Sequence, residues 1–377
     1  MKVLADENMP FVRELFGDWA EVITRPGRTM VPADLHDTDA LLVRSVTQVN
    51  AHLLEQANKL TFVGTATIGC DHIDTQLLAQ RGIAFASAPG CNKVAVGDYV
   101  MAALLRVAAH KNWQLADKTL AVIGAGNTGS EVARRAEGLG MKVLRCDPPK
   151  AAAGAAGLVN YDQALSADII SYHVPITHQG PYATHHLLNA AHIAALDENQ
   201  VLINACRGDV WNNQALLTRQ QGARPLTLVM DVWEHEPAVL AALVPYVLIA
   251  TPHIAGYSLE GKARGTFALY RALCQHIGRA EQHSIASLLP APDISAVSLT
   301  RAPSQHQLAQ LVRLVYDIAH DDSGFRRGLA TGAPDFFDAL RKHYAERREL
   351  GSLILQGVGL DERLGFKVPA QAADKHN

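Results

Sequence analysis

Short apolar runs alternate with helix-like stretches along residues 1–92 of the chain. The runs are typical of buried strands, and residues 50–58 and 74–81, which lie between the last three of them, are predicted to be helices. Strand–helix alternation produces a mostly parallel sheet covered by helices. This region is therefore predicted to be an α/β domain with a mostly parallel sheet. Its four apolar runs are KVLADE, ALLVRS, FVGTAT and IAFASAP.

A second alternating series begins at TLAVI, residues 119–123, after an apolar stretch at 94–109 that is predicted to be a buried helix. Strands that are apolar almost throughout are typical of parallel sheets buried on both faces. The series therefore predicts a Rossmann-type domain over residues 93–257. Its later runs are KVLRCD, DIISYHVP, QVLINACRG, LTLVMDVW and YVLIATPHIAG.

The remaining chain divides at the proline-containing segment LLPAPD, residues 288–293. A helix is predicted at 259–277. Residues 289–377 are predicted to form a C-terminal α+β domain without chemistry-bearing motifs. Its elements are expected as a strand at 294–299, helices at 305–319 and 335–350, and a last strand, SLILQGVG.

Composition narrows the class of protein. The formal net charge of -3 argues against a nucleic-acid-binding surface, which requires clustered Lys and Arg. No apolar stretch has the length of a membrane span, and no signal-peptide pattern is present. The five cysteines include no C-x-x-C pair, and His185 and His186 are expected to be surface residues, so neither a disulfide framework nor a metal site is predicted. A cytoplasmic protein is expected.

A glycine-rich motif follows the strand TLAVI and precedes a helix predicted at 130–139. In a G-x-G-x-x-G motif the glycines permit a tight turn, close approach of a pyrophosphate and close helix packing. The helix N-terminus then directs N–H groups at the phosphates. The sequence therefore predicts a dinucleotide site that comprises Gly124, Gly126, Asn127, Thr128 and Gly129.

The identity of the dinucleotide depends on Asp147, which ends the next strand. A carboxylate at this position accepts hydrogen bonds from the adenosine ribose and repels a 2′-phosphate. NAD is therefore predicted. The neighbouring cations Arg145 and Lys150 leave NADP as an alternative.

Three charged residues follow strand ends or lie in loops of the second domain: Arg207, Glu236 and His253. Oxidation of a 2-hydroxy acid requires a cation for the carboxylate and a base for the hydroxyl proton. Arg207 and His253 match these roles, and Glu236 can orient the imidazole and favour its protonated form. Each residue alone also has a purely structural interpretation: Arg207 as a helix cap, Glu236 as a solvated loop acid, and His253 as a core histidine.

These motifs resemble the D-2-hydroxyacid dehydrogenase family in the segments NACRG, WEHEP and TPHIAG. Stretches such as FVGTATIGCDHID, GKARGT and LLPAP are similar to a branch of that family that oxidises 4-phospho-D-erythronate with NAD during pyridoxal 5′-phosphate synthesis. The resemblance implies a cytoplasmic homodimer in which a flavodoxin-like domain, residues 1–92 and 258–288, binds substrate. It also implies that residues 93–257 bind NAD and that residues 289–377 form the dimerisation domain. It also implies a reaction cleft between the first two domains and hinges near Lys93 and Tyr257.

The resemblance assigns further site residues. Ser45, Thr67 and Tyr257 are expected to contact substrate, and Asp231 is expected to bind the nicotinamide carboxamide. Asp209, His235 and Cys70 depart from the family pattern, and Asp209 adds charge near Arg207. The cofactor is expected to be lined as well by Val174, Ala205, Cys206 and Gly256.

The substrate phosphate requires a second anion site besides Arg207. Arg44, with the hydroxyls of Ser45, Thr67 and Tyr257, is the predicted site. Two alternatives stay open: Arg44 pairs with an acid of its own domain, or Arg347 and Arg348 of a partner subunit bind the phosphate. For the reaction itself the alternatives are another hydroxy acid, such as 3-phosphoglycerate, and a non-catalytic NAD-binding co-regulator.

Overall fold

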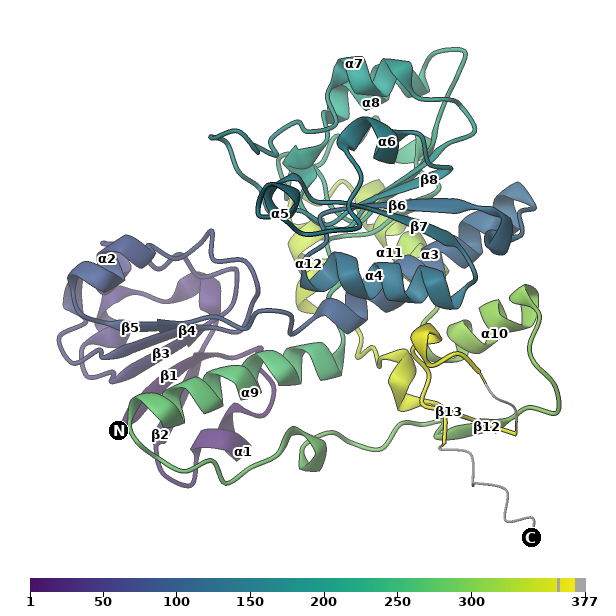
Figure 1. The fold of residues 1–377 in the computed structure, drawn as a ribbon. Coiled ribbons are helices and arrows are strands. Elements are labelled where there is room, and N and C mark those ends of the chain that lie inside the picture. The colour runs from purple at the N-terminus through teal and green to yellow at the C-terminus, as the bar shows by residue number, and fades with distance from the viewer. Residues whose placement is uncertain (358–359, 370–377) are drawn as a thin grey trace, which may run out of the picture. The chain divides into compact units, whose positions relative to one another are not determined.

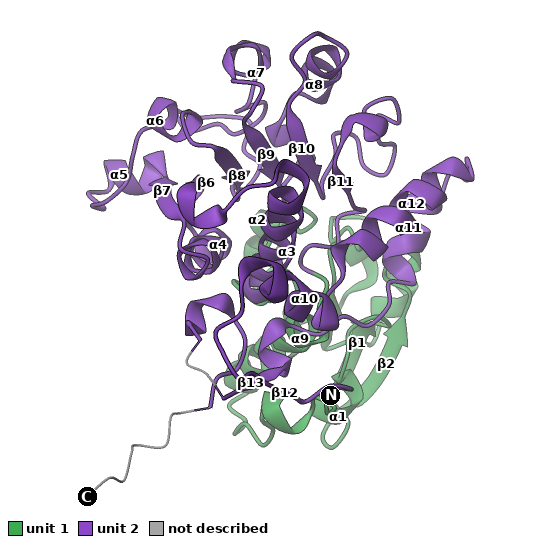
Figure 2. Cartoon of the chain, turned by 90° about the vertical axis from the view of Figure 1, so that its right-hand side faces the viewer, with its two compact units in different colours: residues 1–92, 257–291 green, residues 93–256, 292–377 purple. Residues whose placement is uncertain are grey.

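The computed structural model describes residues 1–357 and 360–369 of the 377-residue chain. These residues form two compact units, of which one comprises residues 1–92 and 257–291 and the other residues 93–256 and 292–377 (Figure 2). The C-terminal segment thus belongs to the same unit as the Rossmann-type sheet. The division into three functional domains stays a prediction.

The first unit contains a five-stranded parallel sheet in the order β2-β1-β3-β4-β5 (Figure 1). This is the flavodoxin-like order, as predicted. Helix α9 (Leu259–His276) packs Leu269 and Leu273 against strand residues such as Val3, so a distant part of the chain completes this core. The other elements are β1 (Lys2–Asp6), α1 (Val12–Phe16), β2 (Glu21–Arg25), β3 (Ala40–Val43), β4 (Phe62–Thr65), α2 (Thr75–Gln80) and β5 (Ala84–Ala86).

One strand of this unit was missed and one prediction was wrong. Strand β2 was not predicted, because it is only partly buried and carries charge at both ends, so its apolar pattern is short. Residues 50–58 do not form an α-helix. They contain only the 3-10 turn Leu53–Gln56, in which Leu53 and Leu54 are buried.

The second unit contains a six-stranded parallel sheet in the order β11-β10-β9-β8-β6-β7. Helices α3 (Lys93–Lys111) and α4 (Asn127–Gly138) lie on one side of it, and α6 (Tyr161–Leu165), α7 (Ala190–Ala195) and α8 (Asn213–Gln220) lie on the other (Figure 1). The remaining elements are β6 (Thr119–Ile123), β7 (Lys142–Cys146), α5 (Pro148–Ala152), β8 (Ile169–Tyr172), β9 (Val201–Asn204), β10 (Thr227–Met230) and β11 (Ile249–Ala250).

The six strands end level with one another at one edge of the sheet. The segments that follow these strands therefore emerge at the same edge. They include the predicted cofactor-binding and catalytic segments. This is the edge at which parallel α/β sheets bind their ligands. The paired last residues are Ile123 with Cys146 and Tyr172, Tyr172 with Asn204, Asn204 with Met230, and Met230 with Ala250.

The C-terminal segment forms three helices and a two-stranded parallel sheet among the described residues. Helix α11 was not predicted, because glycine and charged residues interrupt its apolar spacing. The helix predicted at 335–350 ends at Lys342, and part of the predicted strand SLILQGVG, residues 358–359, lies outside the described residues. The elements are β12 (Ala296–Ser298), α10 (Gln305–Val315), α11 (Ile318–Ala330), α12 (Phe336–Lys342) and β13 (Ile354–Gln356).

Helix α10 carries an apolar stripe that is mostly covered by its own chain. The stripe comprises Leu308, Leu311, Leu314 and Val315. Leu308 and Leu311 are buried, and Gln305 bonds the backbone of Trp113 and Leu115. Leu314 is 50% exposed. Leu314 is therefore an exposed apolar residue of this helix, and a homodimer formed through the C-terminal segment stays a prediction. No helix in the described chain combines the length and apolar character needed to cross a membrane.

Candidate active site

The glycine motif has the geometry that a dinucleotide turn requires. Gly124 has a φ of 92°, and a Cβ there would lie 2.5 Å from the His173 carbonyl oxygen. A Cβ on Gly129 would lie 1.9 Å from the Gly124 oxygen, whereas one on Gly126 would meet nothing within 4 Å. Two glycines are thus required by packing, and the third leaves open space beside the N-terminus of α4. This arrangement fits a pyrophosphate.

Asp147 supports the same turn. Its Oδ2 accepts a hydrogen bond from the Ala125 N–H at 3.0 Å, and its Oδ1 accepts one from the Lys150 N–H at 3.1 Å. A carboxylate has further lone pairs, so ribose hydroxyls can still bind. The two cations that favoured NADP are both engaged, because Arg145 pairs with Glu137 and the Lys150 ammonium donates to the Ala125 oxygen.

His253 and Glu236 form a hydrogen-bonded pair. The His253 Nδ1 lies 2.7 Å from the Glu236 Oε2, and the Glu236 Oε1 accepts the Trp233 N–H at 2.9 Å. Burial raises the pKa of Glu236, but His253, the Trp233 N–H and Arg341 outweigh it, so the net pKa is lowered. The carboxylate is therefore charged at neutral pH. It engages Nδ1 and leaves Nε2 for a reacting group.

Asp231 holds the turn that carries His253. This carboxylate is 1% exposed and accepts the N–H groups of Ile254 and Ala255 at 2.8 and 2.9 Å and the Thr251 hydroxyl at 2.6 Å. The His253 N–H donates to the Asp231 carbonyl at 2.7 Å. These contacts stabilise His253 at a φ of 58°, a conformation that L-residues rarely adopt.

Arg207 follows β9, and its loop packs against the loop of Glu236. Its Nη1 donates to the Cys206 carbonyl at 2.8 Å, and the guanidinium is only partly buried. A Cβ on Gly208 would lie 1.9 Å from the Trp233 carbonyl carbon, so only glycine permits this approach. The backbone contact thus brings the segments of Arg207 and Glu236 together.

The other predicted cofactor residues lie at the same sheet edge. Val174 lies beside Gly124, and burial raises the pKa of the Cys206 thiol to about 11, so this cysteine is a neutral packing residue. Ala205 and Gly256 are partly buried. His173 also lies at this edge of the sheet. Its Nε2 lies 2.7 Å from the Ser171 hydroxyl, and burial lowers its pKa to about 3.

In the first unit, Arg44 and Tyr257 are brought together. The Arg44 Nη2 donates to the Tyr257 hydroxyl at 3.4 Å, and the guanidinium carbon lies 5.9 Å from the ring centre. The Lys262 ammonium lies 5.0 Å from the same ring centre. Lys262 was missed as a candidate, although the segment GKARGT that contains it was noted. Two cations therefore adjoin one tyrosine.

Thr67 belongs to a hydroxyl network at the end of β4. Its Oγ1 lies 2.7 Å from the Thr65 Oγ1 and donates to the Gly69 oxygen at 2.9 Å, and Thr65 also contacts the His72 Nε2 at 2.9 Å. Ser45, by contrast, is exposed. Thr67 is thus held in place by neighbours, whereas the Ser45 side chain faces solvent.

The three residues that depart from the family pattern lie in defined local surroundings. His235 has a φ of 61°, in the left-handed region that favours glycine. The Cys70 thiol donates to the Ile68 oxygen at 3.7 Å. Asp209 lies in the 3-10 turn Gly208–Val210 next to Arg207, and its carbonyl accepts the His186 N–H. Within the described ranges, no cluster of His, Cys, Asp or Glu suited to a metal ion occurs.

Arg347 does not fit the alternative phosphate role proposed for it. It is 5% exposed, and its Nη2 donates to the carbonyls of Ala95 and Ala255 within its own chain. A side chain buried in this way cannot reach the substrate of a partner subunit.

Solved structures of known dehydrogenases have the same fold. The D-lactate dehydrogenase of Aquifex aeolicus, complexed with NAD and lactic acid, is 24% identical with a TM-score of 0.59, over 74% of this chain and 96% of that one. The NAD-bound 3-phosphoglycerate dehydrogenase of Entamoeba histolytica is 22% identical with a TM-score of 0.63, over 74% and 95%. At these identities the likeness shows the fold alone.

Sequence comparisons are more specific. Residues 97–255 match the family described as D-isomer specific 2-hydroxyacid dehydrogenase, NAD binding domain, and residues 288–364 match a domain of unknown function (DUF3410). The erythronate-4-phosphate dehydrogenase of Aeromonas hydrophila is 59% identical over 97% of this chain and 99% of that protein. The enzyme of the same name from Aeromonas salmonicida is 57% identical over 98% and 99%. The chain therefore belongs to the erythronate-4-phosphate dehydrogenase family of NAD-binding 2-hydroxyacid dehydrogenases.

Proposed function

We propose that the chain oxidises 4-phospho-D-erythronate to (R)-3-hydroxy-2-oxo-4-phosphobutanoate with NAD, in pyridoxal 5′-phosphate synthesis. The observation that carries this proposal is the His253–Glu236 pair, 2.7 Å apart, at the sheet edge that also presents Arg207. The name of the relatives, which match along nearly the full chain, supports the substrate.

The proposed roles follow from the chemistry of each side chain. Arg207 binds the substrate carboxylate through its planar guanidinium. The His253 Nε2 takes the proton of the 2-hydroxyl, and Glu236 stabilises the resulting imidazolium. Bound NAD supplies the hydride acceptor. Asp231 keeps the histidine turn in place, and its remaining lone pairs can accept the carboxamide N–H of the nicotinamide.

The substrate phosphate is assigned to the first unit. Arg44 adjoins the Tyr257 hydroxyl, and Lys262 lies against the same ring, so two cations and a hydroxyl are available to one anion. Ser45 and Thr67 add hydroxyls at the ends of the neighbouring strands β3 and β4. The alternative that Arg44 pairs with an acid of its own domain is tested by the Arg44 variant described below.

One assay separates the rival functions. NADH formation is followed by absorbance with 4-phosphoerythronate, erythronate, 3-phosphoglycerate and D-lactate as substrates. The proposal expects turnover to be highest with 4-phosphoerythronate. A preference for 3-phosphoglycerate would identify another hydroxyacid dehydrogenase, and NAD binding without turnover of any substrate would identify a co-regulator.

A cytoplasmic homodimer formed through the C-terminal segment is also proposed. Leu314 is an exposed apolar residue of α10 and lines a 560 Å³ hollow with Leu299, Pro303 and Leu311. Truncation at residue 288 is not a suitable test, because Phe325 and Phe337 of the removed segment are buried in the core of the second unit.

A surface substitution tests the dimer instead. Leu314→Glu is expected to give a monomer in light-scattering mass measurements, because an interface would have to bury its new charge. Val31→Glu changes an equally exposed apolar residue of the first unit and serves as the control. A Leu314→Glu protein that stays dimeric would place the interface elsewhere.

A further inference from the structure

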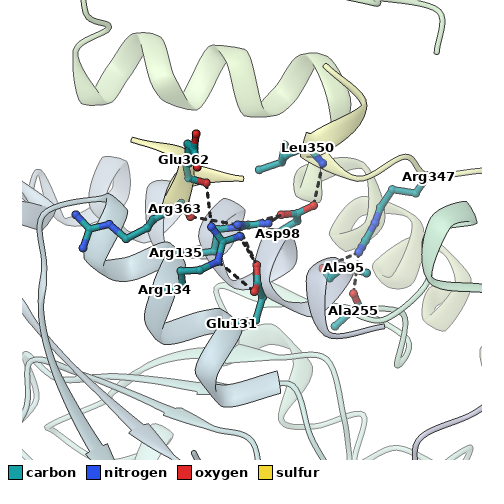
Figure 3. A network of polar contacts seen from close by, with 10 residues as sticks. All are labelled: Ala95, Asp98, Glu131, Arg134, Arg135, Ala255, Arg347, Leu350, Glu362 and Arg363. Atoms are coloured by element: carbon teal, nitrogen blue, oxygen red, sulfur yellow. Dashed lines mark hydrogen bonds and ion pairs between the residues drawn. The ribbon is translucent and has the colours of Figure 1, made fainter. Parts of the chain in front are cut away.

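A buried arginine of the C-terminal segment contacts the turn that carries the proposed catalytic histidine. The Arg347 Nη2 donates to the Ala255 carbonyl at 2.7 Å and to the Ala95 carbonyl, in the first turn of α3, at 2.8 Å (Figure 3). Ala255 is two residues beyond His253, and its N–H already binds Asp231. Asp231 thus binds the N–H group of Ala255, and Arg347 binds its carbonyl.

Arg347 is itself held by its surroundings. Its guanidinium carbon lies 4.2 Å from the centre of the Tyr316 ring, and the Tyr316 hydroxyl donates to Asp321 at 2.9 Å. Tyr344 donates to the same Asp321 oxygen at 2.8 Å. The Arg347 guanidinium therefore packs on the Tyr316 ring, which is held in place by its hydrogen bond to Asp321. Because the guanidinium is held in this way, its hydrogen bond restricts the movement of the Ala255 carbonyl.

The chain just beyond Arg347 is anchored to the cofactor-binding helix. The Leu350 N–H donates to the Asp98 Oδ2 at 2.9 Å, and the Asp98 Oδ1 accepts two N–H groups of Arg135 at 2.8 and 3.1 Å. Burial raises the pKa of Asp98 to about 6, and the Arg135 guanidinium opposes this shift. Arg135 belongs to α4, the helix that follows the glycine motif, and also pairs with Glu131 (Figure 3).

We propose that Arg347 is a positioning residue for the reaction: it fixes the Ala255 carbonyl and thereby holds His253 in contact with Glu236. The hydrogen bonds of Arg347 go to backbone carbonyls and not to the His253 imidazole or the Glu236 carboxylate, so it acts through the backbone of residues 253–255. This inference rests on the proposed function of His253 as the base. The C-terminal segment thus contributes to catalysis as well as to the core of its unit.

The test compares three variants. Arg347→Met keeps an unbranched apolar side chain but removes the hydrogen bonds from Nη2 to both carbonyls, and Arg347→Lys keeps a cationic donor. Arg326→Met is the comparison variant, because Arg326 is another arginine of the C-terminal segment that donates to two backbone carbonyls, those of Val244 and Val247. Unlike Arg347, it also pairs with Asp322, which accepts the Ala250 N–H. All variants are assayed well below their thermal midpoints, so that each is folded.

Arg347→Met is expected to lower kcat by about tenfold, a part of the roughly 10²-fold loss that a 1 Å displacement of catalytic groups can cause. KM and NADH affinity should change little. The acid limb of the pH–rate profile should move to lower pH, because the imidazolium loses part of its contact with Glu236. Arg347→Lys should recover part of the lost rate, and Arg326→Met should lower only the thermal midpoint.

Hydrogen exchange provides a measurement that does not depend on activity. Amides of residues 251–256 are expected to exchange faster in Arg347→Met than in Arg326→Met, because only the former releases the Ala255 carbonyl. If both variants lose the same rate with an unmoved acid limb, Arg347 has only a structural role and the proposal is overturned. If exchange rises as expected but His253→Asn keeps full activity, Arg347 holds the turn of residues 253–255, but neither residue has the proposed role in the reaction.

Discussion

The proposed catalytic groups and the proposed substrate-binding groups are held in different ways. In the second unit, Glu236 and His253 bind each other, and four hydrogen bonds from Thr251, His253, Ile254 and Ala255 to Asp231 fix the histidine turn. In the first unit, Arg44 reaches Tyr257 only at 3.4 Å, and Ser45 faces solvent. Proton transfer depends on sub-ångström placement, whereas a phosphate can be bound by long side chains that adapt to it.

The comparison predicts that a substitution in the catalytic pair acts on every substrate, whereas one in the substrate-binding unit acts on selected substrates. Damage to His253 or Glu236 should lower kcat irrespective of the substrate phosphate. Damage to Arg44 should act only where a phosphate is present.

The largest effect is expected from His253→Asn, which removes the proton acceptor. The kcat/KM of hydroxy-acid oxidation should fall by at least the roughly 10²-fold typical of lost general-base catalysis. NADH binding, followed by fluorescence, should persist. His110→Asn, at an exposed position near the end of α3, is the control and should behave as wild type. A variant with near-normal turnover would show that another group takes the proton.

Glu236→Gln is expected to lower kcat by about tenfold, since the base remains but loses its charged partner. The pH–rate profile gives the sharper measurement. Oxidation requires an unprotonated imidazole, and Glu236 favours the protonated form, so its removal should move the acid limb to lower pH. Glu198→Gln removes an exposed ion pair with Arg224 and should leave the limb in place. An unmoved limb in Glu236→Gln would contradict the role of this carboxylate.

Arg44→Ala is expected to weaken kcat/KM for 4-phosphoerythronate by about 10- to 100-fold, the value of a lost hydrogen bond to a charged group. Unphosphorylated erythronate should be affected little. Arg25→Ala is the control, because it removes another arginine of the same sheet, at the end of the edge strand β2. Equal losses on both substrates would identify Arg44 as a structural residue, and Lys262 would become the next candidate.

The smallest effect is expected from Asp147→Ser, which should narrow the preference for NAD over NADP by several-fold. The variant removes the charge that repels a 2′-phosphate, but Arg145 stays paired with Glu137 and so offers only partial attraction. The ratio of kcat/KM for the two cofactors is the measurement, with Asp162→Ser of α6 as the control. A wild-type enzyme that uses both cofactors equally would refute the assignment of Asp147.

Much of the candidate site was predictable because its signals are local. The glycine motif, Asp147, Arg207 and His253 each directly follow a strand with a strong apolar pattern. Since strands of a parallel sheet end at the same edge, following a strand is enough to place a residue near the ligand. Strand β2 was missed because it is only partly buried, and residues 50–58 were wrongly predicted to be an α-helix because they contain only a short 3-10 turn.

By itself, the sequence determined the two α/β sheets, the dinucleotide turn and the identity of the proposed catalytic residues. Only the tertiary structure decided that Asp231 holds the histidine turn, that Lys262 adjoins Tyr257, and that the stripe of α10 is largely buried. It also decided that Arg347 binds Ala95, 252 residues away in the chain. The physical reason is that such contacts join side chains to backbone groups far apart in sequence, and no local pattern records which distant carbonyl or ring a buried charge will meet.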